Sequence, residues 1–63
     1  MMSQASRAEL CQWGYDSAVA DFEAGASVEQ MAQTAKDAGN LDWLIGYAMA
    51  CVNLWRAKNE GEA

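Results

Sequence analysis

The chain has 63 residues, of which 52% are hydrophobic and 21% charged, and it contains no proline and no histidine. A chain of this length forms one domain, here residues 1–63, which buries about 60% of its unfolded surface. Such a domain tends to need a disulfide, a metal or a partner chain for stability. The formal charge of -5 argues against direct binding of DNA or RNA, because it repels a phosphate backbone. The absence of proline and the many good helix formers predict an all-α fold.

The first helix is predicted over residues 4–24. Ser3 or Ser6 can cap its start, and Gly25 ends it, because glycine most easily adopts the left-handed turn that follows a helix. The i, i+3, i+4, i+7 spacing of apolar residues indicates a core face. This face comprises Ala8, Cys11, Tyr15, Ala18, Val19 and Phe22.

The second helix is predicted over residues 28–38, after the capping box Ser27 to Gln30. A third helix is predicted over residues 41–58, with Asn40 as its cap. Residues 59–63, which are small or charged, are expected to form a frayed C-terminal tail. The apolar stripe of the second helix comprises Val28, Met31, Ala32 and Ala35.

The third helix is apolar over an arc of roughly 220°, about twice what a surface helix needs. One stripe is expected to face the chain's own core: Leu41, Leu44, Ile45, Ala48, Cys51, Val52 and Trp55. The adjoining stripe is expected to form the interface of a two-fold homodimer: Trp43, Tyr47, Ala50 and Leu54. Gly46 falls on the narrow polar strip, although its spacing to Ala50 permits close helix approach. A membrane span is not expected, because the apolar run is about 15 residues long and a bilayer needs about 20.

The first helix also offers a candidate surface for a partner protein. Trp13 points away from the core face. The ordinary interpretation is a partly covered ring that packs on the end of the third helix or against a dimer mate, and the functional one is a hot spot for a partner. Acidic residues repeat beside it at heptad spacing: Glu9, Asp16 and Glu23. A solvated outer face is the ordinary interpretation of such a repeat.

Catalysis, metal binding and cofactor binding are not expected. Without histidine, neither Cys11 nor Cys51 has the usual base that generates a thiolate, and no common zinc spacing is present. No glycine-rich phosphate loop occurs, and three short helices are expected to build no pocket of substrate size. Both thiols are expected to be buried and reduced in the cytoplasm.

The segments "SRAELCQWGYDSAVADFEAG" and "AGNLDWLIGYAMACVNLW" give the chain a resemblance to the short early proteins of lambdoid temperate phages that are encoded between exo and xis. The resemblance extends over the whole chain in length and character and carries no functional residues. It implies a small helical protein, made after prophage induction, that redirects the host cell cycle or replication through protein contacts.

The function predicted from these observations is a non-enzymatic protein-protein interaction module in the bacterial cytoplasm, a homodimer that binds a host protein. One alternative is a nucleic-acid-directed regulator that mimics or associates with DNA. Another is a structural subunit of a larger assembly, in which the apolar stripe meets a different protein.

Overall fold

The computed structural model describes residues 5–62 and confirms an all-α fold. Its helices are α1 (Arg7–Glu23), α2 (Val28–Lys36) and α3 (Leu41–Glu62), which form an elongated bundle of 50 × 19 × 18 Å. The candidate cap Ser3 and the predicted helix start at residue 4 lie outside the described residues.

The helix starts follow the capping signals in the sequence. The hydroxyl of Ser6 accepts from the Glu9 backbone N–H, and the Glu9 carboxylate accepts in return from the Ser6 N–H, so α1 begins with a complete capping box. Ser27 and Gln30 form the predicted box at α2. Between these helices Gly25 has φ of 93°, the left-handed conformation expected of it.

The start of α3 is also as predicted, whereas its end is not. The Asn40 side chain accepts from the Trp43 backbone N–H at 3.0 Å. The predicted frayed tail over residues 59–63 is wrong for residues 59–62, which continue the helix. Arg56, Ala57 and Lys58 are strong helix formers, and nothing before Gly61 interrupts them, so the helix extends beyond its packed part.

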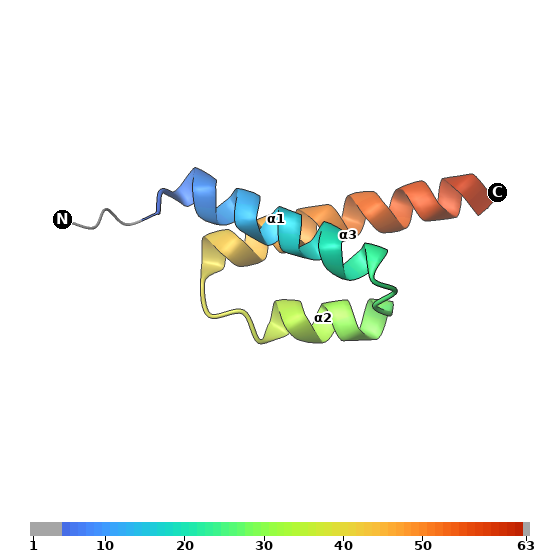
Figure 1. Cartoon of the computed structure of the whole chain (residues 1–63), viewed down its shortest axis with the longest axis horizontal. Coiled ribbons are helices and arrows are strands. Elements are labelled where there is room, and N and C mark those ends of the chain that lie inside the picture. Colours follow the sequence, from blue (N-terminus) through green and yellow to red (C-terminus); the bar gives the residue numbers. More distant parts are fainter. Residues whose placement is uncertain (1–4, 63) are drawn as a thin grey trace.

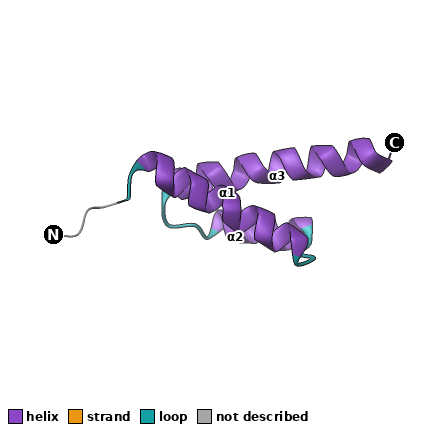
Figure 2. Ribbon diagram, turned by 45° about the horizontal axis from the view of Figure 1, so that its top comes forward, coloured by secondary structure: helices purple, strands orange, loops and turns teal. Residues whose placement is uncertain are grey.

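The first and third helices run in the same direction and lie against each other, while α2 runs back along one side of the pair (Figures 1 and 2). They cross at two glycines. A Cβ built on Gly14 would lie 1.9 Å from the Trp43 carbonyl oxygen, and one built on Gly46 would lie 1.8 Å from the Cys11 carbonyl oxygen. The helices therefore meet backbone to backbone, at a separation that no side chain larger than hydrogen permits.

An internal repeat underlies this crossing. The pattern Gly-Tyr-x-x-Ala-x-x-Asp/Asn occurs at residues 14–21 and recurs 32 residues later, at residues 46–53. Each tyrosine forms a hydrogen bond with the last residue of the other copy. The Tyr47 hydroxyl donates to Asp21 Oδ2 at 2.6 Å, and Asn53 Nδ2 donates to the Tyr15 hydroxyl at 3.3 Å. The crossing thus has an approximate two-fold symmetry.

The core lies where α2 covers one side of the crossing. Its buried side chains come from all three helices: Ala18 of α1, Met31 of α2, and Tyr47, Ala50 and Cys51 of α3. Tyr15, Phe22, Ala35, Trp43, Leu54 and Trp55 pack against them while half-buried. Ala18, Ala50 and Cys51 are small, whereas Met31 and Tyr47 are the largest fully buried side chains.

The predicted core faces need correction in every helix. Ala8, Val28 and Ala32 are exposed, and the core side of α1 is centred on Gly14 and Ala18. The largest correction concerns α3, whose expected core stripe contributes few buried residues. Four of its members are exposed instead: Leu41, Ile45, Ala48 and Val52.

Candidate interaction surfaces

The predicted dimer interface of α3 is part of the chain's own core. Tyr47 and Ala50 have no exposed surface, and Trp43 and Leu54 pack half-buried against the core. Tyr47 and Ala50 therefore cannot reach a second chain without opening the helix pair, and their assignment to a subunit interface is wrong. Gly46 explains why this stripe faces inward. Because glycine has no side chain, α1 can approach α3 closely on this side.

Tyr47 is the most constrained side chain of this face. Its ring stacks on Trp43 with the centroids 5.0 Å apart, and its hydroxyl donates to Asp21. Burial, and next the hydrogen bond to the Asp21 carboxylate, raise the pKa of Tyr47 to about 12. A tyrosine that stays protonated and fully hydrogen-bonded in this way holds α1 and α3 together and is not available for proton transfer near neutral pH.

The outward side of α3 carries a row of exposed apolar side chains, which we call the α3 seam: Leu41, Ile45, Ala48 and Val52. Leu41 is 67% exposed, Ile45 41% and Val52 51%. Met49, 52% exposed, borders the row and lines a shallow apolar groove with Ala48, Val52 and Asn53. The excess of apolar surface expected for this helix is therefore present, but on the stripe that was assigned to the core.

The candidate partner surface of α1 lies on one outward side of that helix. Trp13 is 51% exposed, and Glu9, Asp16 and Glu23 are exposed within an arc of about 80° that includes it. Hydrogen bonds hold two of the carboxylates in place, since Glu9 completes the N-terminal capping box and Asp16 accepts from Gln12 at 2.9 Å. All four side chains lie on the same side of α1, with Glu9 and Glu23 about 21 Å apart along the helix axis.

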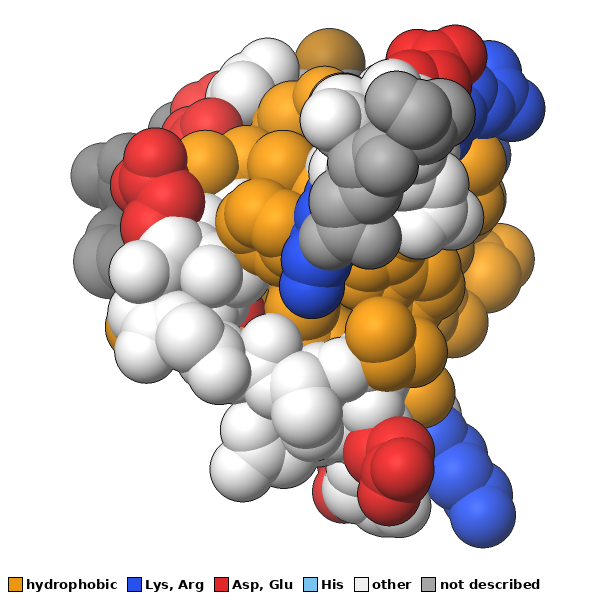
Figure 3. All heavy atoms as spheres, turned by 90° about the vertical axis from the view of Figure 1, so that its right-hand side faces the viewer, with side chains coloured by type: hydrophobic (Ala, Val, Ile, Leu, Met, Phe, Trp, Pro, Cys, Tyr) orange, Lys and Arg blue, Asp and Glu red, His pale blue; other side chains and the backbone are white. Residues whose placement is uncertain are grey.

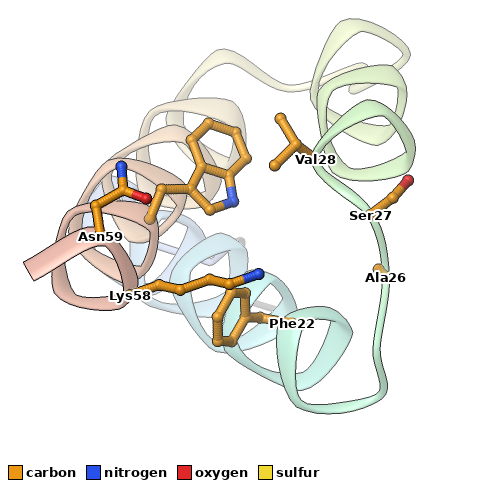
Figure 4. Close-up of a pocket in the computed structure, with 7 residues that line it drawn as sticks. Phe22, Ala26, Ser27, Val28, Lys58 and Asn59 are labelled. Atoms are coloured by element: carbon orange, nitrogen blue, oxygen red, sulfur yellow. The ribbon is translucent and has the colours of Figure 1, made fainter. Parts of the chain in front are cut away.

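A hollow of about 430 Å³ lies at the end of the bundle where α1 turns into α2. Phe22, Val28 and Lys58 point into it from the three helices (Figure 4). The hollow is open to solvent and not enclosed, so its volume alone does not make it a ligand site, which buries most of its ligand. The remaining lining residues are Ala26, Ser27, Trp55 and Asn59, so the walls hold no carboxylate and no thiol. Viewed from this end, hydrophobic side chains gather at the surface, with acidic side chains at the margins (Figure 3).

Both cysteines are free. Cys51 is buried in the core, and this burial raises the pKa of its thiol, whereas Cys11 is half-buried at the helix crossing.

Among the described residues, no three side chains of the metal-binding types come together. Within the same part of the chain, no helix is both long and apolar enough to cross a membrane.

Gly14 and Gly46 organise the molecule. The spacing of Gly46 to Ala50 predicted close helix approach on α3, whereas hydrophobic periodicity does not indicate Gly14. Glycine adds no apolar surface, so a search for the most hydrophobic stripe of a helix passes over it. The detectable signal was the shared pattern Gly-Tyr-x-x-Ala in residues 14–18 and 46–50, in which small residues are four apart on both helices.

Comparisons with protein families, with characterised proteins and with solved structures found no match to this chain, so the fold and its surfaces carry the functional argument alone.

Proposed function

We propose that this protein acts without catalysis, by binding another protein through Trp13 and the acidic side of α1. The observation that supports this function is the 51% exposure of Trp13, a large apolar residue, at the surface of α1. A tryptophan buries on the order of 200 Å² when covered, so the exposed half offers about 2.5 kcal/mol at 25 cal/mol per Å². That is the contribution of a binding hot spot.

The carboxylates define the chemistry of the partner. Glu9 and Asp16 lie one helical turn on either side of Trp13, and their hydrogen bonds fix them before binding occurs. A complementary surface has an apolar pocket for the indole, bordered by lysine or arginine side chains. The net charge of -5 accelerates the approach of such a basic surface, with a rate that falls as salt rises.

The class of partner follows from the resemblance to phage early proteins, which remains a prediction. On that basis the target is a protein of the host bacterium, bound in the cytoplasm after prophage induction, and the consequence is altered replication or cell division. Two alternatives also remain predictions: a DNA mimic or DNA-associated regulator, and a structural subunit. A gel shift with mixed-sequence DNA at low salt tests the first of these, because electrostatic binding is strongest there.

The proposal is tested by placing a photo-reactive amino acid at position 13 and irradiating the protein in a bacterial lysate. We expect one cross-linked host protein, which disappears when unlabelled wild-type chain competes and when the salt concentration is raised. The control is the same amino acid at Val28, which is 54% exposed on a different helix.

The purified target is then titrated with wild-type chain and with Trp13→Ala. A loss of 2.5 kcal/mol corresponds to roughly 70-fold weaker binding, whereas Val28→Ala should leave the affinity within about twofold. Helix content by circular dichroism must be equal in all three chains. Equal cross-linking from positions 13 and 28, or unchanged affinity of Trp13→Ala, refutes this function.

A further inference from the structure

The α3 seam has the spacing of one strand of a two-stranded coiled coil. Leu41, Ile45, Ala48 and Val52 follow each other at intervals of four, three and four residues, and the half-buried Trp55 continues the series. This is the alternation of d and a positions in a heptad, with Leu41, Ala48 and Trp55 at d and Ile45 and Val52 at a. At 1.5 Å per residue the row from Leu41 to Trp55 is about 21 Å long.

The side chains that border the seam indicate what covers it. The e positions of the same heptads are Asp42, Met49 and Arg56, so opposite charges lie one heptad before and one heptad after a central methionine. Arg56 is exposed and makes no ion pair with the described side chains. Asp42 pairs through Oδ1 with Arg7 at 3.1 Å, and its other carboxylate oxygen remains free to accept.

We propose that the α3 seam binds the α3 seam of a second copy of this chain, in antiparallel orientation, with Met49 on the two-fold axis. In antiparallel coiled coils the e positions of one helix face the e positions of the other. Asp42 then faces Arg56 of the second copy, Arg56 faces its Asp42, and the two Met49 side chains meet. A parallel pair of the same helices would bring Asp42 and Arg56 into no such contact.

The apolar layers agree with this register. Antiparallel pairing places a positions against d positions, so that Val52 packs on Ala48 of the second copy. Ile45 meets the exposed part of its Trp55, the rest of which packs on that copy's own core. A larger side chain faces a smaller one at the centre, Leu41 at the end of the row faces Asn59 of the second copy, and no charged side chain enters the layers. The net charge of -5 on each copy opposes association elsewhere on the surface, and the pairing therefore depends on this uncharged row.

The association is measured by sedimentation equilibrium of the whole chain between 1 and 200 µM, beside two variants that add the same charge to α3. We expect Val52→Lys, at the centre of the seam, to weaken self-association by at least about 100-fold, because an ammonium would be buried. Ala57→Lys, which is exposed on the same helix and outside the seam, should leave it unchanged. Both substituted residues are exposed in the single chain, so circular dichroism should show an unaltered fold.

Two further variants test the orientation. Met49→Cys should form a disulfide between two copies at position 49 on mild oxidation, identified by peptide mapping, since only the antiparallel register brings these residues together. Arg56→Glu should weaken the dimer about tenfold by placing two like-charged pairs across the interface, and Asp42→Lys added to it should restore binding.

A monomer at 200 µM, or a dimer that tolerates Val52→Lys, overturns the proposal. A dimer that forms no link between positions 49, or that Arg56→Glu leaves unchanged, overturns its antiparallel register.

Discussion

Replacement of Gly46 by alanine tests the helix crossing most directly. The added Cβ would lie 1.8 Å from the Cys11 carbonyl oxygen, whereas real Cβ atoms essentially never come closer than 3.0 Å to another heavy atom. The obstacle is backbone, so no rotamer change relieves it, and α1 and α3 must separate by at least about 1.2 Å at this point. A gap of 0.5–1 Å already forfeits a quarter to a half of the dispersion energy across an interface.

The size of the effect follows from two opposing contributions. Alanine favours the helix by about 1 kcal/mol over glycine, while overpacking of this severity costs about 3 kcal/mol and the opened contacts add to that cost. We therefore expect Gly46→Ala to lower the free energy of unfolding by about 3 kcal/mol. A domain of this size has roughly 3–5 kcal/mol in total, so the variant should keep only about 0–2 kcal/mol and unfold at a much lower urea concentration than the wild type.

The assay is urea unfolding followed by circular dichroism at 222 nm. Gly61→Ala is the matched control, because Gly61 is on the same helix and a Cβ there would meet nothing within 4 Å. This control should be neutral or stabilised by up to about 1 kcal/mol. If Gly46→Ala proves as stable as the wild type, the backbone contact between α1 and α3 does not exist and the arrangement of the core is different.

Two further predictions concern the titrating groups of the core. Because folding raises the pKa of Tyr47 from 10.0 to about 12, its contribution to stability is complete below pH 10 and is lost as the pH rises to 12. Stability should fall by on the order of 2 kcal/mol over that range, and Tyr47→Phe should abolish this part of the fall in pH-dependent urea unfolding. Cys51 should react with a thiol reagent at pH 8 at least about tenfold more slowly than Cys11, because it is buried and its thiol pKa is raised. Equal rates in the native protein would contradict its burial, and equal rates in 6 M guanidinium chloride are the control.

The helix boundaries were predictable because capping is local chemistry. Ser27 and Gln30 satisfy each other's backbone groups whatever the rest of the chain does, and Gly25 takes a left-handed conformation that other residues avoid. The end of α3 was missed because helical propensity alone maintains it where nothing packs against it.

The inward face of α3 could not be found from hydrophobicity. Both of its stripes are apolar, and the stripe with larger aliphatic side chains was the natural choice for the core. The inward face is set instead by how closely the backbones approach. Gly46 and Ala50 are small enough for α1 to lie against them, and Tyr47 fills the space beneath α2 while its hydroxyl donates to Asp21. These residues are buried by a helix that is distant in sequence. The spacing of apolar residues within one helix contains no information about that contact.

The candidate partner surface of α1 was easier to predict. Trp13 and the acidic residues around it required only the orientation of one helix, and the helical repeat supplies that. The sequence predicted that α3 has more apolar surface than the core can cover. The exposed part was expected on the stripe of Trp43 and Tyr47, whereas it lies on the α3 seam.

The glycine crossing also has a consequence for how the chain folds. Gly14 and Gly46 are 32 residues apart in a chain of 63, so the main contact of the molecule joins segments separated by half its length. Neither the α1–α2 half nor the α2–α3 half contains that contact, and each forms few contacts of its own. We therefore expect this small helical protein to fold more slowly than a helical hairpin, because the closing of the chain has to come before most of the stabilising contacts. No truncation that removes α1 or α3 should leave a folded remainder.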